Sequence, residues 1–456
     1  QVHVDRSLRA VALIGFAAIA SVVVGMMFGG GAQPLQFSDP GPVVRWGQPL
    51  VKLVLNLSMA TAIGSLVLGA FAGNAQERQR IQVVASWAAA LWAAASATYF
   101  VMTYLSASGS ALSYGPAFSE GLWLFATQIE LGVLLAWNVV FAVVLSLTTM
   151  AFTGQRMAAV NAAIGLAGLY PLAESGHASA DAGHAVAVNS MLMHLVGISV
   201  WVGGLVALYS VFYANTDRSA VLVRRYSTLA LAAFVLVAIS GLTSGYIRLY
   251  SPGDLLSDYG LMLMGKAVLL IGLGVLGAMH RLKLVKEFAE KATGFWKLVA
   301  LELFVMGLAM GLGTALAKTP PPISPDPFVP PTPAELLTGD PLPPELTNLS
   351  WITVWDLDPL WSTVVLFGLF LYLRAVAILR SRGDKWPVVR TVSWVLGMLV
   401  LFYVTNGAPN AYQEYLFSVH MVGHMVLSMM VPVLLVPGAP VTLLSRAQAP
   451  RTDGSK

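Results

Sequence analysis

The sequence predicts an all-α, polytopic membrane protein with about twelve transmembrane helices in two bundles. Of its 456 residues, 57% are hydrophobic and 11% are charged, whereas a soluble domain carries about 25% charged residues. Continuous apolar runs of about 18 or more residues, each long enough to cross a bilayer, recur along the chain. These runs do not alternate polar and apolar residues, so they favour helices over the strands of a membrane barrel.

Each expected helix is an apolar run bounded by charged residues, glycine or proline. The first lies near 9–30, follows Arg6 and Arg9, and is longer than the apolar core of a signal peptide, so we interpret it as a membrane span. The other expected spans lie near 50–72, 82–104, 121–149, 157–173, 185–213, 226–247, 260–281, 296–317, 359–379, 389–406 and 416–437.

Lysine and arginine are distributed unevenly between alternate loops. With the N-terminus in the cytoplasm, the outer loops hold only Arg45, Lys52, Arg248 and Lys318. Cytoplasmic loops of membrane proteins carry an excess of basic residues, so we predict a multi-pass protein of the cell (plasma) membrane with both ends inside. The net charge of +4 is scattered over short loops, and no basic tract indicates a nucleic-acid partner.

A proline-rich segment divides the chain. Residues 318–350 contain the runs TPPPISPDPFVPPTP and GDPLPPE, which favour extended conformations and cannot form a packed core. We therefore predict an external linker at 318–350. It joins a membrane domain of about nine helices, 1–317, to a second membrane domain of about three helices, 351–456.

The chain contains no cysteine, which excludes disulfides, thiolate metal sites and a catalytic thiol. Of the seven histidines, five fall on the predicted outer side. His184, Met191, His194 and Trp201 are spaced by seven, three and seven residues, which places them on one face of a helix. Imidazole with thioether suits monovalent copper better than zinc or magnesium. The alternative is that these side chains pack and hydrogen-bond without a metal.

A second pair of histidines lies near the outer end of the last expected helix. His420 and His424 are four residues apart, and Met421, Met425 and Met429 form an adjoining ridge. Two histidines at this spacing commonly ligate a metal. The same pair could ligate a haem, or only pack.

Several charged residues fall inside expected spans, where an unpaired charge is expensive. We expect Glu130 to pair with Lys266, and Glu302 to lie within reach of His280 or Arg281. Gly203–Gly204 is typical of close approach between helices. The sequence holds no phosphate loop, nucleotide fingerprint or serine-triad spacing, and we do not predict an enzyme.

Two stretches of the chain resemble known families. HLVGISVWVGGL, YGLMLMGKAVLL and MHRLK are similar to the copper resistance protein D (CopD) family, over roughly Glu174 to Pro322. SVHMVGHMVLSMMVPVLLVPGAPVTLL resembles the start of the CtaG family of cytochrome c oxidase assembly proteins, over roughly Trp351 to Ala447. The CtaG pattern normally continues for several more helices, so we expect the second domain to be incomplete.

The resemblance implies copper handling: copper uptake across the membrane, copper delivery to an oxidase, or both. It implies His177, His184 and His194 as ligands in the first domain and His420 and His424 in the second. The residue spacing adds thioether ligands to these histidines, and they are Met191, Met421 and Met425. We expect Cu⁺ rather than Cu²⁺, with the lipid bilayer and cytochrome c oxidase or its assembly factors as partners. The alternatives are a haem-binding membrane redox protein and a structural scaffold subunit.

Overall fold

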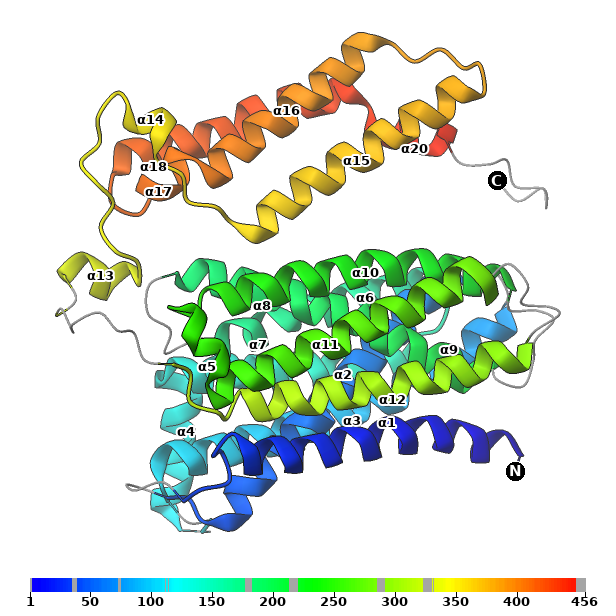
Figure 1. The fold of residues 1–456 in the computed structure, drawn as a ribbon, viewed down its shortest axis with the longest axis vertical. Coiled ribbons are helices and arrows are strands. Elements are labelled where there is room, and N and C mark those ends of the chain that lie inside the picture. The colour runs from blue at the N-terminus through cyan, green and yellow to red at the C-terminus, as the bar shows by residue number, and fades with distance from the viewer. Residues whose placement is uncertain are drawn as a thin grey trace. The chain divides into compact units, whose positions relative to one another are not determined.

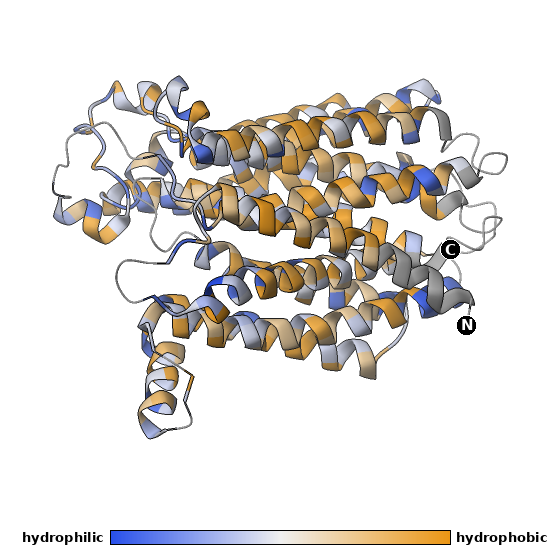
Figure 2. Ribbon diagram, turned by 60° about the horizontal axis from the view of Figure 1, so that its bottom comes forward, coloured by the Kyte–Doolittle hydropathy of each residue, from blue (hydrophilic) through white to orange (hydrophobic). Residues whose placement is uncertain are grey.

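The computed structural model describes residues 2–34, 39–72, 75–110, 112–113, 115–176, 183–212, 220–284, 292–322, 330 and 332–447. Within this part, eleven helices are long and apolar enough to cross a membrane. Helix α1 (Val2–Phe28) carries a further apolar stretch, Ala12–Phe28. The prediction of an all-α, multi-pass membrane protein is confirmed. Figure 2 shows hydrophobic residues along most of the length of these helices.

The chain divides into two compact units. Unit 1 comprises Gln1–Ser179 and Ser190–Pro327, and unit 2 comprises Ala180–Asn189 and Phe328–Lys456. The first residues of helix α8 (His184–Ile198) therefore belong to unit 2 and the remainder to unit 1. The predicted boundaries of the external linker stay a prediction.

Unit 1 is a helical bundle in which α1 lies beside α12 and α2 beside α3 (Figure 1). Two π-helical turns, η1 and η4, each continue directly from a longer helix. Besides α1 and α8, its elements are α2 (Pro42–Phe71), α3 (Ala75–Ser108), α4 (Pro116–Gln128), α5 (Glu130–Ala151), α6 (Gln155–Ala167), α7 (Leu169–Ser175), η1 (Ser199–Gly203), α9 (Gly204–Phe212), α10 (Ala220–Tyr246), η3 (Pro252–Leu256), α11 (Asp258–Met279), η4 (His280–Leu284) and α12 (Ala292–Leu316).

The expected span at 121–149 is not one helix. It breaks at Ile129, which has an extended backbone, so that α4 ends at Gln128 and α5 begins at Glu130. At Gly132, an added Cβ would overlap the Phe125 carbonyl. Glycine therefore allows the last turn of α4 to pack directly on α5.

The backbones of α2 and η1 are in direct contact, with no side chain between them. An added Cβ at Gly203 would overlap the Ala60 carbonyl, and one at Gly64 would overlap the backbone of Gly204. Close backbone approach through glycine is a common way for membrane helices to pack, because lipid offers no hydrophobic driving force between them. The predicted role of Gly203–Gly204 is confirmed.

Side chains from three other helices cap the C-terminus of α2. Gln155 donates to the Ala70 carbonyl at 2.9 Å and Arg225 to the Phe71 carbonyl at 2.7 Å. Arg78 donates to the Ala72 carbonyl at 3.0 Å. The last carbonyls of a helix lack partners within the helix and carry partial negative charge, so two guanidinium groups stabilise this end.

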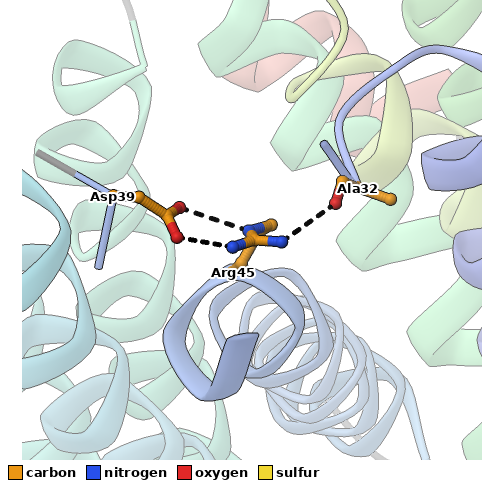
Figure 3. A network of polar contacts seen from close by, with 3 residues as sticks. All are labelled: Ala32, Asp39 and Arg45. Atoms are coloured by element: carbon orange, nitrogen blue, oxygen red, sulfur yellow. Dashed lines mark hydrogen bonds and ion pairs between the residues drawn. The ribbon is translucent and has the colours of Figure 1, made fainter. Parts of the chain in front are cut away.

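An arginine holds the connection between α1 and α2 at the other end of the bundle (Figure 3). Arg45 donates from Nε to Asp39 at 3.3 Å and from Nη2 to the same carboxylate at 2.5 Å. Its Nη1 donates to the Ala32 carbonyl at 3.3 Å. The guanidinium thus fixes both sides of the connecting segment to the first turn of α2.

Unit 2 packs its spanning helices around Tyr372. The Tyr372 ring stacks on Trp394 at 4.9 Å, and its hydroxyl donates to the Gly438 carbonyl at 2.8 Å. The last span is interrupted by a π turn and by Pro432 and Pro437. The elements of unit 2 are α13 (Pro333–Thr338), α14 (Ser350–Thr353), α15 (Pro359–Ser381), α16 (Val388–Asn406), α17 (Ala408–Tyr412), α18 (Phe417–Met425), η5 (Val426–Met430), α19 (Val431–Leu435), η6 (Val436–Gly438) and α20 (Pro440–Ala447).

Substitution of one glycine tests the contact between α2 and η1. Gly203→Ala should destabilise the protein by about 1–3 kcal/mol or more, because the new methyl group forces two backbones apart. Gly272→Ala is the matched control, since an added Cβ there meets no atom within 4 Å and alanine favours a helix. Thermal unfolding in detergent measures both. A Gly203→Ala protein as stable as wild type would contradict the contact.

Candidate functional site

Polar side chains from three helices meet inside unit 1. His194 Nδ1 lies 3.0 Å from Ser240 Oγ, and Lys266 Nζ lies 3.4 Å from His194 Nε2. Ser190 Oγ donates to the Ser240 carbonyl at 2.9 Å and lies 3.1 Å from Ser244 Oγ. Helix α8 supplies Ser190 and His194, α10 supplies the other serines, and α11 supplies Lys266. We call these five residues the His194 cluster.

The hydrogen bonds indicate the tautomer of His194. Ser240 Oγ donates to the Val237 carbonyl at 3.0 Å, so its lone pairs face the ring. His194 Nδ1 therefore donates to Ser240, and Nε2 carries the lone pair of a neutral imidazole. Lys266, an ammonium with donors only, faces that lone pair.

This geometry determines which group a metal ion must displace in order to bind His194. A copper ion would bind the Nε2 lone pair, which the Lys266 ammonium faces in this structure. Copper binding at His194 therefore requires Lys266 to move aside. Lys266 was expected to pair with Glu130, but Glu130 is exposed at the start of α5, and Lys266 meets His194 instead.

The other expected ligands of the first domain lie at different positions along the axis of α8. Met191 is half-buried one turn before His194, on the same face of α8. His184 is ten residues before His194, which is about 15 Å along a helix, too far for both to bind one ion. His177 lies outside the described residues. Among the described residues of this group, Met191 and His194 are close enough along α8 to bind one ion.

His184 instead lies beside an acidic pocket in unit 2, within electrostatic range of Glu414. The pocket is lined by the carboxylates of Asp340, Asp356, Asp358 and Glu414, and by Gly183 beside His184. Asp340 accepts from the Gly183 amide at 2.5 Å, and Asp358 accepts from Asn189 at 2.5 Å. The start of α8 is thus tied to two of the four carboxylates.

The carboxylates of this pocket repel one another. Burial raises the pKa of Asp356 above its ordinary value, and the charges of Asp340 and Asp358 raise it further. Burial also raises the pKa of Glu414, with Asp340 and Asp356 adding to the shift and His184 opposing it. The pocket is therefore a place where positive charge is favourable.

His420 and His424 lie on the surface of α18. Both side chains are exposed, and Met421 and Met425 beside them are 38% and 48% exposed. The π turn η5 follows at once. Met429 lies within η5, so the predicted ridge of Met421, Met425 and Met429 runs from an α-helix into a π turn and stays a prediction.

The described residues limit the kind of metal site that is possible. Among them, no three His, Asp or Glu side chains could hold one metal ion together. The alternative of a haem-binding protein stays a prediction.

Sequence reasoning missed the groups that surround the expected ligands. Ser240 and the carboxylates of Asp340, Asp356 and Glu414 were not singled out. The sequence gives little indication of these residues, because the acidic residues lie in separate loops and serine is common in membrane helices. The expected contact of Glu302 with His280 is confirmed, with Oε1 and Nδ1 2.6 Å apart.

Three family models match the chain. Residues 37–188 match the copper resistance protein D-like N-terminal domain, and residues 220–316 match copper resistance protein D. Residues 370–454 match the cytochrome c oxidase caa3 assembly factor family, CtaG. These matches define a copper-related membrane protein.

More particularly, the chain is a fusion of a CopD-like region with a CtaG-type region, as the resemblance predicted. The CopD similarity begins earlier than expected and includes most of the first helices. His420 and His424 fall inside the CtaG match, Lys266 falls inside the second CopD match, and Met191 and His194 lie between the two CopD matches.

Curated relatives share shorter parts of the chain. An uncharacterized protein of Mycobacterium bovis, Mb0105, is 40% identical over 114 residues, 25% of this chain and 17% of the relative. The copper transport protein CutJ of Bacillus subtilis is 32% identical over 163 residues, 34% of this chain and 29% of that protein. The chain thus covers less than a third of these relatives' lengths. No solved structure matches the chain.

Neutralising Asp356 tests the repulsion within the acidic pocket. A carboxyl whose pKa is raised by folding binds more protons when folded, so stability falls as pH rises from about 4 through the raised pKa. Asp356→Asn should therefore raise the unfolding temperature at pH 7 but not at pH 4. The gain should be at most about 0.5 kcal/mol, because Asp356 reaches solvent, which screens its charge.

Glu345→Gln is the control, since Glu345 does not line the pocket. An Asp356→Asn protein that is less stable than wild type at pH 7 would contradict the repulsion.

Proposed function

We propose that this protein carries monovalent copper across the cell membrane, and that Met191 and His194 in unit 1 bind the ion on its way. The observation that carries the proposal is the neutral imidazole of His194, whose Nε2 lone pair points at Lys266 inside the bundle. A thioether and an imidazole on one helix face suit Cu⁺. Lys266 supplies a positive charge at this position when copper is absent.

The families support copper as the cargo. Two of the matching family models carry descriptions that name copper resistance, and the related Bacillus protein is described as a copper transport protein. None of these descriptions names a reaction, so transport fits them better than catalysis. On the orientation predicted from lysine and arginine, the acidic pocket with His184 faces the outside, where it attracts copper ions.

A delivery role for unit 2 rests on its own family. The CtaG family model is described as an assembly factor of cytochrome c oxidase. On α18, an exposed face carries side chains suited to Cu⁺, and these are His420, Met421, His424 and Met425. We propose that this face passes copper to cytochrome c oxidase or its assembly factors. Exposure favours transfer, because a partner's ligands can reach an ion held there.

Replacing Lys266 tests competition between its ammonium and copper. Lys266→Leu should raise the affinity of the purified protein for Cu⁺ by about tenfold or more, since a like charge beside the ligand opposes the ion. Lys297→Leu, which replaces an exposed lysine on α12, is the control and should leave the affinity unchanged. Competition with a chromogenic Cu⁺ chelator measures both. Equal affinity for wild type and Lys266→Leu would remove Lys266 from the site.

Copper stoichiometry separates the two proposed sites. Elemental mass spectrometry of protein loaded with Cu⁺ should find less copper in His194→Ala, and also less in His420→Ala/His424→Ala. Met191→Leu should weaken binding. Met193→Leu should not, because Met193 is buried on another face of α8. Folded variants with undiminished copper would reject the corresponding site.

A further inference from the structure

A polar pocket of about 310 Å³ lies at the end of unit 1 where α2 ends. Helix α2 forms one side, the first turns of α3 form another, and the segment that joins α5 to α6 forms the third. The proposed copper path does not use it. Its polar side chains are those of Ser65, Arg78, Gln79, Gln82 and Thr153, and we call it the Arg78 pocket.

The Arg78 pocket carries positive charge. Arg78 lines it, and no Asp or Glu does so among the described residues. The bond to the Ala72 carbonyl at 3.0 Å uses one N–H of Arg78, whereas a guanidinium has five. No other described residue accepts a hydrogen bond from Arg78. Its remaining N–H groups can therefore bind an anion.

The first turn of α6 adds hydrogen-bond donors. Gly154 precedes this helix, no side chain caps its first turn, and Thr153, Gly154 and Ala158 line the pocket. The first N–H groups of a helix have no partner within the helix, and their partial positive charge favours an anion. Helix α3 also begins beside the pocket, at Ala75. Two helix N-termini and one guanidinium thus surround it.

A buried hydroxyl without a partner lies at the inner end of the pocket. Ser65 is fully buried, and its Oγ has no hydrogen-bond partner among the described residues. By contrast, Ser58 on the same helix donates to the Val54 carbonyl at 2.7 Å. An unpaired buried hydroxyl is costly, so the inner end of the pocket favours a polar ligand over an apolar one.

Asn161 repeats this feature close to Ser65. Since α2 ends here and α6 begins here, the two helices run in opposite directions, and Gly69 lies beside Ala158. Four residues back along α2 and three forward along α6 bring Ser65 and Asn161 to nearly the same level. Asn161 is fully buried, and neither polar atom of its side chain has a partner among the described residues.

The surroundings of the pocket favour a membrane lipid as its ligand. The pocket lies where the spans α2 and α5 end and where α3 and α6 begin, which is the level of the polar headgroups of a bilayer. Val83 follows Gln82 and Phe152 precedes Thr153, and these two apolar side chains are 55% and 52% exposed. Basic pockets between membrane helices bind the headgroups of anionic lipids.

We propose that the Arg78 pocket binds the phosphate group of an anionic membrane phospholipid. Arg78 and the first amides of α6 donate to the phosphate oxygens, the rest of the headgroup extends toward Ser65, and the acyl chains lie along Val83 and Phe152. The lipid joins α2, α3 and α6 at one end of the bundle, so its binding stabilises the folded protein. This inference is independent of the proposed copper transport.

Native mass spectrometry of the full chain in detergent, titrated with phosphatidylglycerol, tests the proposal. Wild type should bind one copy of the lipid more tightly than any further copy. Arg78→Gln should lower the affinity for that copy about fivefold or more, because it removes one basic residue beside an anionic headgroup. Arg225→Gln is the matched control and should bind as wild type does, since Arg225 also caps α2, at the Phe71 carbonyl, but does not line the pocket.

Gln79 offers two further variants that leave the cap of α2 intact. Its side chain is exposed and lines the pocket, so its replacement does not disturb the core. Gln79→Glu should lower the affinity for phosphatidylglycerol about fivefold, and Gln79→Lys should raise it by a similar factor, because the new charge repels or attracts the phosphate. These two variants decide the test if Arg78→Gln does not fold.

Equal affinity for phosphatidylglycerol in wild type, Arg78→Gln and both Gln79 variants would overturn the proposal. So would a loss of affinity in Arg225→Gln as large as that in Arg78→Gln, because it would indicate a general effect of charge. Phosphatidylcholine should bind more weakly, since its trimethylammonium group is repelled by Arg78, and equal binding of the two lipids would contradict an anionic headgroup.

Inorganic phosphate separates a lipid from a free anion. At equal ionic strength, phosphate should raise the unfolding temperature of wild type no more than chloride does. A rise in phosphate that disappears in Arg78→Gln would overturn the lipid as the ligand and assign the pocket to free phosphate.

Discussion

Inside a bilayer a polar side chain finds no water, so each one must be paired within the helical bundle or bear a large cost of desolvation. The arrangement of unit 1 depends on this constraint. Two such groups lie among the described residues of unit 1: His194 with Lys266 and Ser240, and His280 with Glu302. The serines and threonines of the spans bond mostly to carbonyls of their own helices. Polar contacts between different helices, such as Ser96 with Asn138 and Gln48 with Thr103, also join the bundle.

Close packing brings these groups together. Glycine at Gly64 and Gly203 lets α2 touch the π turn that follows α8, and that turn presents the Trp201 carbonyl to Tyr226. Two of the stretches that carry the CopD resemblance, HLVGISVWVGGL and YGLMLMGKAVLL, lie far apart along the chain, yet they supply His194 and Lys266, which meet in the fold. The stretch MHRLK supplies His280, which contacts Glu302 of α12.

The sequence predicted those features that follow from local composition. Apolar runs predict spans, and the cost of a charge in lipid predicts that Glu302 finds His280. The same reasoning wrongly paired Lys266 with Glu130, because the sequence does not show which helices are neighbours in the fold. The actual partner, His194, is 72 residues away in the sequence, and only packing selects it. The break at Ile129 and the π turns depend on tertiary contacts, and the acidic pocket gathers carboxylates from separate loops.

The proposed transport requires above all that Met191 and His194 bind one copper ion in place of the Lys266 ammonium. X-ray absorption at the copper edge tests this directly, using Cu⁺-loaded protein that carries His420→Ala and His424→Ala to remove the second site. We expect a copper environment with both imidazole nitrogen and thioether sulfur, and loss of sulfur scattering when Met191→Leu is added. A spectrum with only oxygen ligands, or sulfur that persists without Met191, would contradict it.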